Sequence, residues 1–258
     1  MSDWHRLDGE LAAWSLGTGP RLVFVHGFTQ TSTSWRPIAA ALAEDGYESV
    51  VVDAPGHGDS APVHVDLRRA AELLTAMCGP AVYIGYSMGG RLCLHAAVFD
   101  PRSVVALVLI SASPGIADDL ERATRRDADA RLADHLGEVG VETFLDEWLT
   151  QALFAGLASD VAQRADRLRN SAEGLASSLR LAGAGAQESL WPRLAELAMP
   201  VLAVAGAADS KYAAIARRIA DTVRHGRCEV IEGAGHAAHL QAADRVLAAV
   251  RGWLRTLH

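Results

Sequence analysis

The sequence predicts an α/β fold: a mostly parallel, doubly wound sheet that carries a helical lid insertion. Short apolar runs alternate with helical patterns along most of the chain, and one long stretch lacks any strand pattern. The chain has 258 residues, 50% of them hydrophobic and 21% charged. This length suffices for one large core that carries an insertion.

Six apolar runs predict buried strands. They are continuously apolar rather than alternating, which is typical of a parallel sheet covered on both faces. They cover residues 22–25, 49–52, 81–84, 104–110, 201–204 and 228–231. Helical patterns lie between them, at residues 35–45, 67–78, 88–99, 212–223 and 237–257. This alternation implies right-handed crossover connections.

The alternation stops between residues 114 and 191, which are rich in Ala, Arg, Leu and Glu. Helices are expected there at about residues 122–132, 141–149, 161–169 and 174–181. We therefore expect a core formed by residues 1–113 and 192–258, with residues 114–191 inserted as a lid.

Composition excludes several classes of function. The net charge of −7 argues against nucleic-acid binding. No apolar run is long enough to span a bilayer and the start lacks a secretory signal, so we expect a cytoplasmic protein. Three scattered cysteines and the lack of an HExxH pattern predict no disulfide framework, metal or organic cofactor. A monomer is the default expectation.

The basic residues are strongly biased in type. Of the 24 basic residues, only Lys211 is a lysine, and the rest are arginines. Genome base composition explains this bias most simply, because alanine is also abundant. The number of arginines therefore carries no functional argument, and only their positions can.

Ser87 has the surroundings of a nucleophile. The pattern Gly-x-Ser-x-Gly, from Gly85 to Gly89, follows an apolar strand and opens a helix. In that context it is typical of a nucleophile elbow, in which a tight turn exposes the serine at the carboxyl edge of the sheet. Small residues two positions before and after the serine relieve crowding in the turn.

A nucleophile elbow requires an acid and then a histidine later in the chain. Asp209 follows the strand at 201–204, and His236 follows the strand at 228–231 through a glycine-rich turn. His236 can accept the proton of Ser87, and Asp209 can fix the imidazole tautomer. His239, three residues later in the final helix, is a weaker alternative.

The loop after the first predicted strand contains His26, Gly27 and Phe28. The glycine permits a tight turn, so the next amide can face a substrate oxygen. The backbone N–H groups of Phe28 and Met88 are therefore the expected oxyanion hole. His26 and the turn-rich segment at residues 53–60 are expected to support the loop.

The motifs at residues 26–28, 53–60, 85–91 and 233–236 together resemble those of the α/β-hydrolase superfamily. The fuller sequence resembles one branch of it, the 2-succinyl-6-hydroxy-2,4-cyclohexadiene-1-carboxylate synthases of menaquinone biosynthesis, commonly called MenH. The residues that carry this resemblance include Thr29, Ser34, Trp35, Glu121, Arg122, Arg125, Arg126, Asp129, Trp148, Leu153, Phe154, Arg169, residues 178–191, Gly206, Asp209, Lys211 and Tyr212. The segment after His239 departs from the family pattern, which often has Glu and Pro there.

The resemblance implies a carbon–oxygen elimination that expels pyruvate from a succinyl-bearing cyclohexene carboxylate, without an acyl-enzyme. Ser87, primed by His236, would act as the base or relay the proton. The implied partner is a small polycarboxylate. Arg91, one helical turn after Ser87, would bind carboxylate with Arg125 and Arg169. The side chains of Tyr86 and Trp148 match further substrate-binding positions.

Two other classes of function remain open from the sequence. A carboxylester or lactone hydrolase could use the same Ser87, but it would gain nothing from converging arginines if its ester were neutral. A non-catalytic binding protein would be expected to have lost part of the triad, and none of the three residues is missing.

Overall fold

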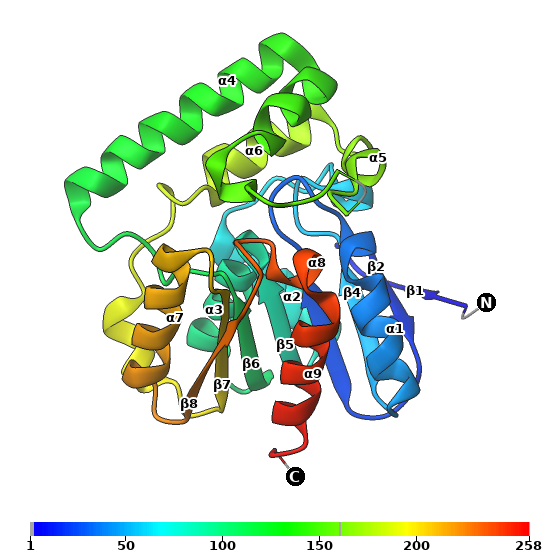
Figure 1. Ribbon diagram of the computed structural model, residues 1–258. Helices are drawn as coiled ribbons and strands as arrows, with labels where there is room; N and C mark the ends of the chain where they lie inside the picture. The colour runs from blue at the N-terminus through cyan, green and yellow to red at the C-terminus, as the bar shows by residue number, and fades with distance from the viewer. Residues whose placement is uncertain (1–2, 160, 258) are drawn as a thin grey trace.

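The computed structural model describes residues 3–159 and 161–257 (Figure 1). These residues form an eight-stranded sheet in the order β1-β2-β4-β3-β5-β6-β7-β8. The strands are β1 (His5–Leu7), β2 (Ala13–Leu16), β3 (Arg21–Val25), β4 (Glu48–Val52), β5 (Ala81–Tyr86), β6 (Val104–Ile110), β7 (Val201–Gly206) and β8 (Gly226–Ile231). Strand β2 is antiparallel to its neighbours β1 and β4, and every pairing from β4 to β8 is parallel. The predicted fold class is confirmed.

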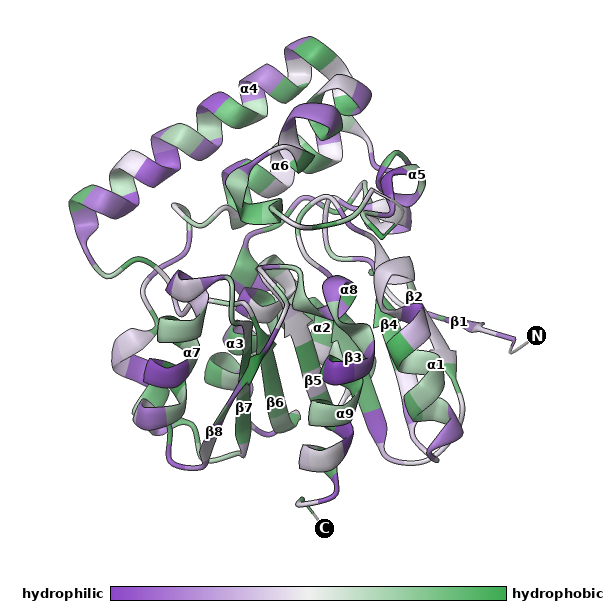
Figure 2. Ribbon diagram, in the orientation of Figure 1, coloured by the Kyte–Doolittle hydropathy of each residue, from purple (hydrophilic) through white to green (hydrophobic). Residues whose placement is uncertain are grey.

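Helices cover both faces of this sheet. One face packs against α2 (Leu67–Cys78), α3 (Met88–Phe99) and α7 (Ser210–Thr222), and the other against α1 (Arg36–Glu44) and α9 (Ala243–Leu254). Within β3, Val23 and Val25 face the first group of helices, whereas Leu22 and Phe24 face the second. Burial on both sides explains the continuously apolar inner strands, such as β6 and β7, which are green in Figure 2. Strand β8 was also expected to be buried, but it is an edge strand and is mostly exposed or half-buried.

Some elements differ from the expectation. The short strands β1 and β2 were not predicted, because they are only partly buried and lack a continuous apolar run. The expected final helix is divided into α8 (Ala238–Gln241) and α9, because Ala242 has non-helical backbone angles, φ −142° and ψ 53°. Short 3₁₀ turns also occur at η1 (Ser32–Trp35), η2 (Gly58–Ser60), η3 (Ala152–Phe154) and η4 (Trp191–Glu196).

The chain between β6 and β7 forms the helices α4 (Asp119–Leu149), α5 (Arg164–Arg167) and α6 (Ala172–Ala182). They lie beyond the carboxyl edge of the parallel strands (Figure 1). Two expected helices are joined in α4 across a kink at Gly140, where φ is 77°, and the helix expected at 161–169 is reduced to α5. Met1, Ser2, Asp160 and His258, which fall within the expected core and lid, lie outside the described residues. No helix in the described ranges is both long and apolar enough to cross a bilayer.

Buried imidazoles hold the loops at this carboxyl edge. The Nε2 atom of His26 accepts a hydrogen bond from the Ala54 N–H at 3.0 Å, so its Nδ1 carries the proton and donates to the Gly27 carbonyl at 2.8 Å. The Nε2 atom of His57 accepts from the Thr29 N–H at 3.3 Å. The two rings lie edge to face, with centroids 5.0 Å apart. The expected supporting role of His26 is thus present in the structure.

Burial lowers the pKa of His26 to about 4 and that of His57 to about 3. Unfolded histidine has a pKa near 6.5, so below about pH 6.5 the unfolded chain binds protons that the folded chain does not. We expect the stability from these two residues to be fully present above about pH 6.5 and lost as the pH falls toward 4. His26 alone accounts for roughly 3 kcal/mol at pH 4. Urea unfolding at a series of pH values measures this loss.

Carboxylates also titrate in this range, so the two imidazoles must be observed directly. The ring-proton chemical shifts of His26 and His57 in the folded protein should stay constant from about pH 7 to 5. A ring that titrates above pH 6 in the folded protein would contradict the assignment of neutral, loop-holding imidazoles.

Candidate active site

Ser87 lies at the junction of β5 and α3. Its backbone is left-handed, with φ 50° and ψ −109°, and its N–H donates to the Ile110 carbonyl at 2.8 Å. A Cβ atom on Gly85 would collide with the backbone of Gly89, and one on Gly89 would collide with carbonyls at the end of β3. This crowding is the physical reason for the two glycines that flank the nucleophile in the sequence.

Three stretches of chain bring Ser87, His236 and Asp209 into line. The Nε2 atom of His236 lies 3.1 Å from the Ser87 Oγ, and its Nδ1 lies 2.8 Å from the Asp209 Oδ2. Because a carboxylate can only accept, Nδ1 carries the proton and Nε2 is free to receive the serine proton. The His236 side chain is 2% exposed, so this contact is shielded from water.

Asp209 is itself fixed by the helix that it precedes. It caps α7, and its Oδ1 accepts the Tyr212 N–H at 3.1 Å. Burial opposes ionisation of Asp209, but the hydrogen bonds from His236 and from the Tyr212 N–H outweigh it, and the pKa of Asp209 lies below its ordinary value. Asp209 is therefore a carboxylate at neutral pH, as the orienting member of a triad requires.

His239, the alternative histidine, lies elsewhere. Its ring packs 4.1 Å from Tyr86 and 4.7 Å from Trp35, measured between centroids, and its Nε2 contacts the Gln30 amide. Burial lowers the pKa of His239 well below its ordinary value. His239 lies outside the lining of the cavity that contains Ser87. The geometry thus places His236, and not His239, beside the nucleophile.

Two backbone amides are available to an oxyanion. Among the described residues, the N–H groups of Phe28 and Met88 donate no hydrogen bond in the turns, loops and helix caps. The Gly27 carbonyl is held by the Gln30 N–H at 3.1 Å and by His26. Because the peptide group is trans, the Phe28 N–H points away from that anchored carbonyl. Phe28, Met88 and Ser87 line one cavity.

This cavity, the catalytic cavity below, has a volume of about 210 Å³. Of the predicted substrate-binding residues, Arg91, Arg125 and Trp148 line it. The indole Nε1 of Trp148 is buried and has no acceptor among the described residues. Asp129 and Ser178 also line the cavity.

Arg91 is a cation without a carboxylate partner among the described residues. Its Nη1 donates to the Ala182 carbonyl at 2.8 Å and to the Gln187 Oε1 at 3.3 Å, both of them neutral acceptors. Burial, with a smaller contribution from Arg125, lowers the pKa of Arg91 to about 10. Arg125 differs, because its Nε is paired with the buried Asp129 carboxylate at 2.7 Å. Arg91 therefore offers the uncompensated charge that an anionic ligand would neutralise.

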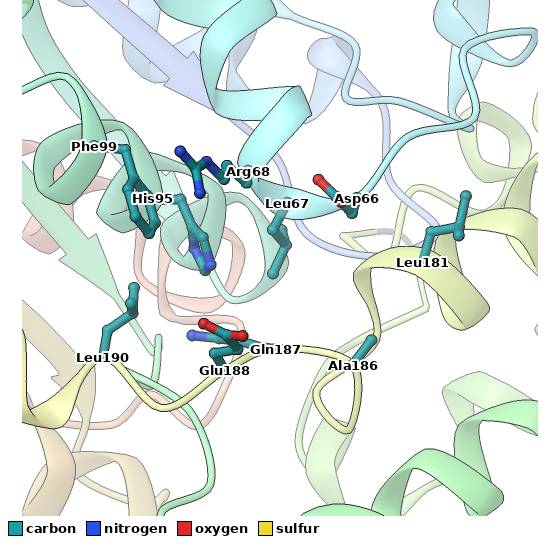
Figure 3. Close-up of a pocket in the computed structure, with 10 residues that line it drawn as sticks. All are labelled: Asp66, Leu67, Arg68, His95, Phe99, Leu181, Ala186, Gln187, Glu188 and Leu190. Carbon is teal, nitrogen blue, oxygen red and sulfur yellow. The ribbon is translucent and has the colours of Figure 1, made fainter.

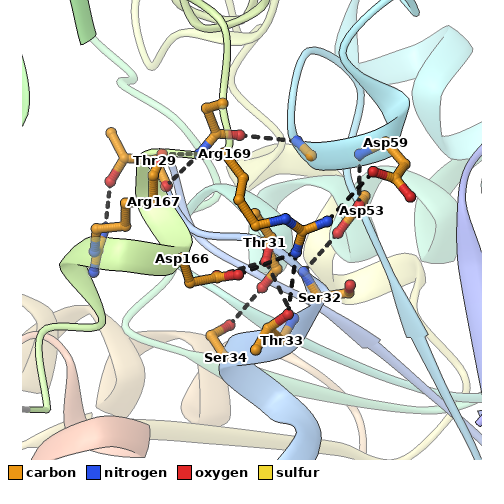
Figure 4. A network of polar contacts seen from close by, with 12 residues as sticks. Thr29, Thr31, Ser32, Thr33, Ser34, Asp53, Asp59, Asp166, Arg167 and Arg169 are labelled. Carbon is orange, nitrogen blue, oxygen red and sulfur yellow. Dashed lines mark hydrogen bonds and ion pairs between the residues drawn. The ribbon is translucent and has the colours of Figure 1, made fainter. Parts of the chain in front are cut away.

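Two predicted substrate-binding residues lie outside the cavity lining. Tyr86 packs against Gly27 and against His236, whose ring centroid is 5.5 Å from its own. Arg169 is paired with Asp166 at 3.1 Å and with Asp59 at 3.3 Å, as Figure 4 shows. Tyr86 therefore contacts a residue of the cavity wall, whereas the partners of Arg169 all lie outside the lining.

Arg167, which the sequence analysis did not single out, is buried in the structure, unlike Arg169. Its side chain donates to the Thr29 Oγ1 and to the Ala162 carbonyl. Asn170 donates to the Thr29 carbonyl at 2.7 Å. These contacts, part of which Figure 4 shows, tie the lid to the loop that carries Phe28. Nothing in the sequence distinguishes Arg167 from Arg169, because both lie in one arginine-rich run.

A separate cavity lies between α2, α3 and residues 186–190 (Figure 3). Its charged and polar walls include Asp66, Arg68, His95 and Glu188, and no triad residue lines it. Over residues 3–159 and 161–257, no group of three or more His, Cys, Asp and Glu side chains is placed to hold a metal ion. The catalytic cavity is therefore the site where Ser87, Asp209, His236 and Arg91 come together.

Comparison with known proteins agrees with this architecture. The model of the alpha/beta hydrolase family matches residues 22–249. A Bacillus subtilis protein provisionally named 2-succinyl-6-hydroxy-2,4-cyclohexadiene-1-carboxylate synthase is 36% identical over 234 residues, 85% of each chain. The synthase of that name from Salmonella paratyphi C is 33% identical over 230 residues, 85% of this chain and 88% of the relative. The structure of MenH from S. aureus superposes with a TM-score of 0.89 at 29% identity, covering 100% of this chain and 99% of that one. The chain belongs to the α/β hydrolase family.

Proposed function

We infer that this chain is a carbon–oxygen lyase of menaquinone biosynthesis. It eliminates pyruvate from 2-succinyl-5-enolpyruvyl-6-hydroxy-3-cyclohexene-1-carboxylate and leaves 2-succinyl-6-hydroxy-2,4-cyclohexadiene-1-carboxylate. The observation that carries this proposal is the similarity to named synthases across 85% of the chain. The unpaired cation Arg91 in the catalytic cavity suits a substrate with several carboxylates.

The substrate and product define the electron flow. The ring carbon that bears the succinyl group loses its proton, and the C–H electron pair forms a double bond to the next ring carbon. The ring double bond moves one position along, and its electrons expel the enolpyruvyl oxygen at C5. The leaving enol takes up a proton and becomes pyruvate. The lost proton is adjacent to the succinyl ketone, so negative charge develops on that ketone oxygen.

The triad supplies the base in this proposal. His236 lies 3.1 Å from the Ser87 Oγ and can accept its proton, while Asp209 stabilises the imidazolium. Ser87 then removes the substrate proton or relays it to His236. The N–H groups of Phe28 and Met88 stabilise the developing enolate oxygen. No covalent acyl-enzyme is needed.

The lid and the cations bind the substrate. We assign Arg91 and Arg125 to its carboxylates, and Trp148 to the cavity wall, where its indole N–H can donate to an oxygen of the substrate. Tyr86 and Arg169 lie outside the cavity lining. We propose residues 114–191 as the lid, the cytoplasm as the compartment, and a monomer as the acting form.

Ser87→Ala should lower the kcat of pyruvate release by about a thousandfold, because it removes the proton-transferring hydroxyl from a turn that tolerates a smaller side chain. A lactate dehydrogenase-coupled assay measures the release, and thermal unfolding checks the fold. Ser159→Ala, at an exposed position of the lid, is the matched control. Activity within a few-fold of wild type would refute the role of Ser87.

Arg91→Ala should lower kcat/KM by an amount equivalent to roughly 2–4 kcal/mol of activation free energy, because a desolvated substrate carboxylate loses its partner. Arg91→Lys should recover only part of this loss, because an ammonium cannot form the two parallel hydrogen bonds of a guanidinium. The exposed Arg102→Ala is the control. An unchanged kcat/KM for Arg91→Ala would remove this residue from the substrate site.

A serine hydrolase is the second candidate, and the fully aligned triad favours it. Such an enzyme would attack an acyl carbon with Ser87 and turn over by hydrolysis. Assays of p-nitrophenyl acetate hydrolysis and pyruvate release on one preparation separate the two. We expect pyruvate release to dominate; rapid ester turnover without pyruvate would establish the hydrolase instead.

A further inference from the structure

A second chamber adjoins the catalytic cavity and has a volume of about 360 Å³. The two share Arg91, Arg125, Lys211 and Tyr212 on their walls, so a ligand in one lies next to the other. We call this second space the outer chamber. Neither Ser87 nor His236 lines it, so it lies beyond the reacting groups.

The walls of the outer chamber carry an excess of positive charge. Its cations are Arg91, Arg125, Lys211 and Arg218, and its acids are Asp118 and Glu121. The Asp118 carboxylate is already engaged, because it caps α4 by accepting the Glu121 N–H at 2.8 Å. Outside this lining, Asp129 offsets the charge of Arg125. The cations that remain without a carboxylate partner among the described residues are Arg91, Lys211 and Arg218.

Lys211 is the only lysine of the chain, in a sequence whose other basic residues are all arginine. It lies in the first turn of α7, where the helix dipole disfavours a cation. Within residues 3–159 and 161–257, its ammonium has neither a hydrogen bond nor an ion pair. The charge of Lys211 also helps to keep Asp209 ionised. That carboxylate is already hydrogen-bonded to His236 and to the Tyr212 N–H, so the Lys211 ammonium remains available to a ligand anion.

Arg218 lies seven residues after Lys211, so both side chains lie on the same face of α7. Its guanidinium stacks on the Trp191 ring, 3.9 Å from the centroid, and the Trp191 Nε1 donates to the Gly115 carbonyl at 3.1 Å. Stacking uses the face of the guanidinium and leaves its N–H groups free at the edge. Arg218 is therefore a preorganised donor with no acceptor among the described side chains.

We propose that Lys211 and Arg218 form a carboxylate-binding subsite in the outer chamber, next to Arg91. This proposal rests on the inferred elimination reaction, because that reaction determines which carboxylates are present to bind. Two sources supply the same chemistry: a carboxylate arm of the substrate during the reaction, or the carboxylate of the pyruvate as it leaves. In either case, Lys211 and Arg218 extend the region of positive electrostatic potential around Arg91 to positions farther from Ser87.

Calorimetric titration tests this subsite with two probes, pyruvate for the leaving group and succinate for the substrate arm. Lys211→Gln should weaken the binding of at least one probe by about fivefold, as expected for one exposed charge pair. Lys211→Arg should retain most of the affinity, because it keeps the charge. Arg217→Gln, an exposed neighbour on α7 outside both cavity linings, is the matched control.

The probe that responds identifies the source. Weaker pyruvate binding assigns the subsite to the leaving group, and weaker succinate binding assigns it to the substrate arm. The proposal is overturned if wild type binds neither probe, or if Lys211→Gln and Arg217→Gln bind both probes equally well. Binding requires no turnover, so a wild-type protein that binds these anions but releases no pyruvate would defeat the inferred lyase activity and leave the subsite standing.

Discussion

The left-handed backbone at Ser87 is the constraint on which the site depends. A non-glycine residue with φ 50° is strained by about 1 kcal/mol or more, and it persists only where its surroundings hold it. Here the Ile110 carbonyl accepts the Ser87 N–H, and α3 begins at the next residue. The close approach of β5 to α3 requires Gly85 and Gly89. One turn thus exposes the hydroxyl and brings the Met88 amide to the catalytic cavity.

The loop that carries Phe28, whose amide we propose for the oxyanion hole, is held by the chain between β6 and β7. Thr29, one residue after Phe28, also has a left-handed backbone, with φ 69°. Arg167 and Asn170, both from the lid, bind its side chain and its carbonyl, and His57 binds its N–H. The loop that carries the Phe28 amide is therefore held between the core and the lid. We therefore expect the position of the Phe28 amide relative to Ser87 to depend on the contacts of Arg167 and Asn170 with Thr29.

The sequence alone predicted the features that are determined by residues close together in the chain. Apolar runs located the parallel strands, and the turns after β5, β7 and β8 located Ser87, Asp209 and His236, because strand ends of a parallel sheet share one edge. The strands β1 and β2 were missed because they are short and lack a continuous apolar run. Arg167 and Arg169 could not be told apart, because only the tertiary structure determines which one turns inward. The burial of Arg91 among neutral acceptors likewise arises from the lid packing on α3.

The triad alone does not select a reaction, because the same three side chains can transfer an acyl group or move a proton. Selection has to come from the groups that position the substrate. Gln187 and the Ala182 carbonyl accept hydrogen bonds from the Nη1 of Arg91 without cancelling its charge, whereas an acid in place of Gln187 would neutralise it. The cavity thus keeps a desolvated cation near Ser87, for which we propose a role in proton transfer. That arrangement favours a polyanion whose negative charge spreads over several groups, and it gives a neutral ester no advantage.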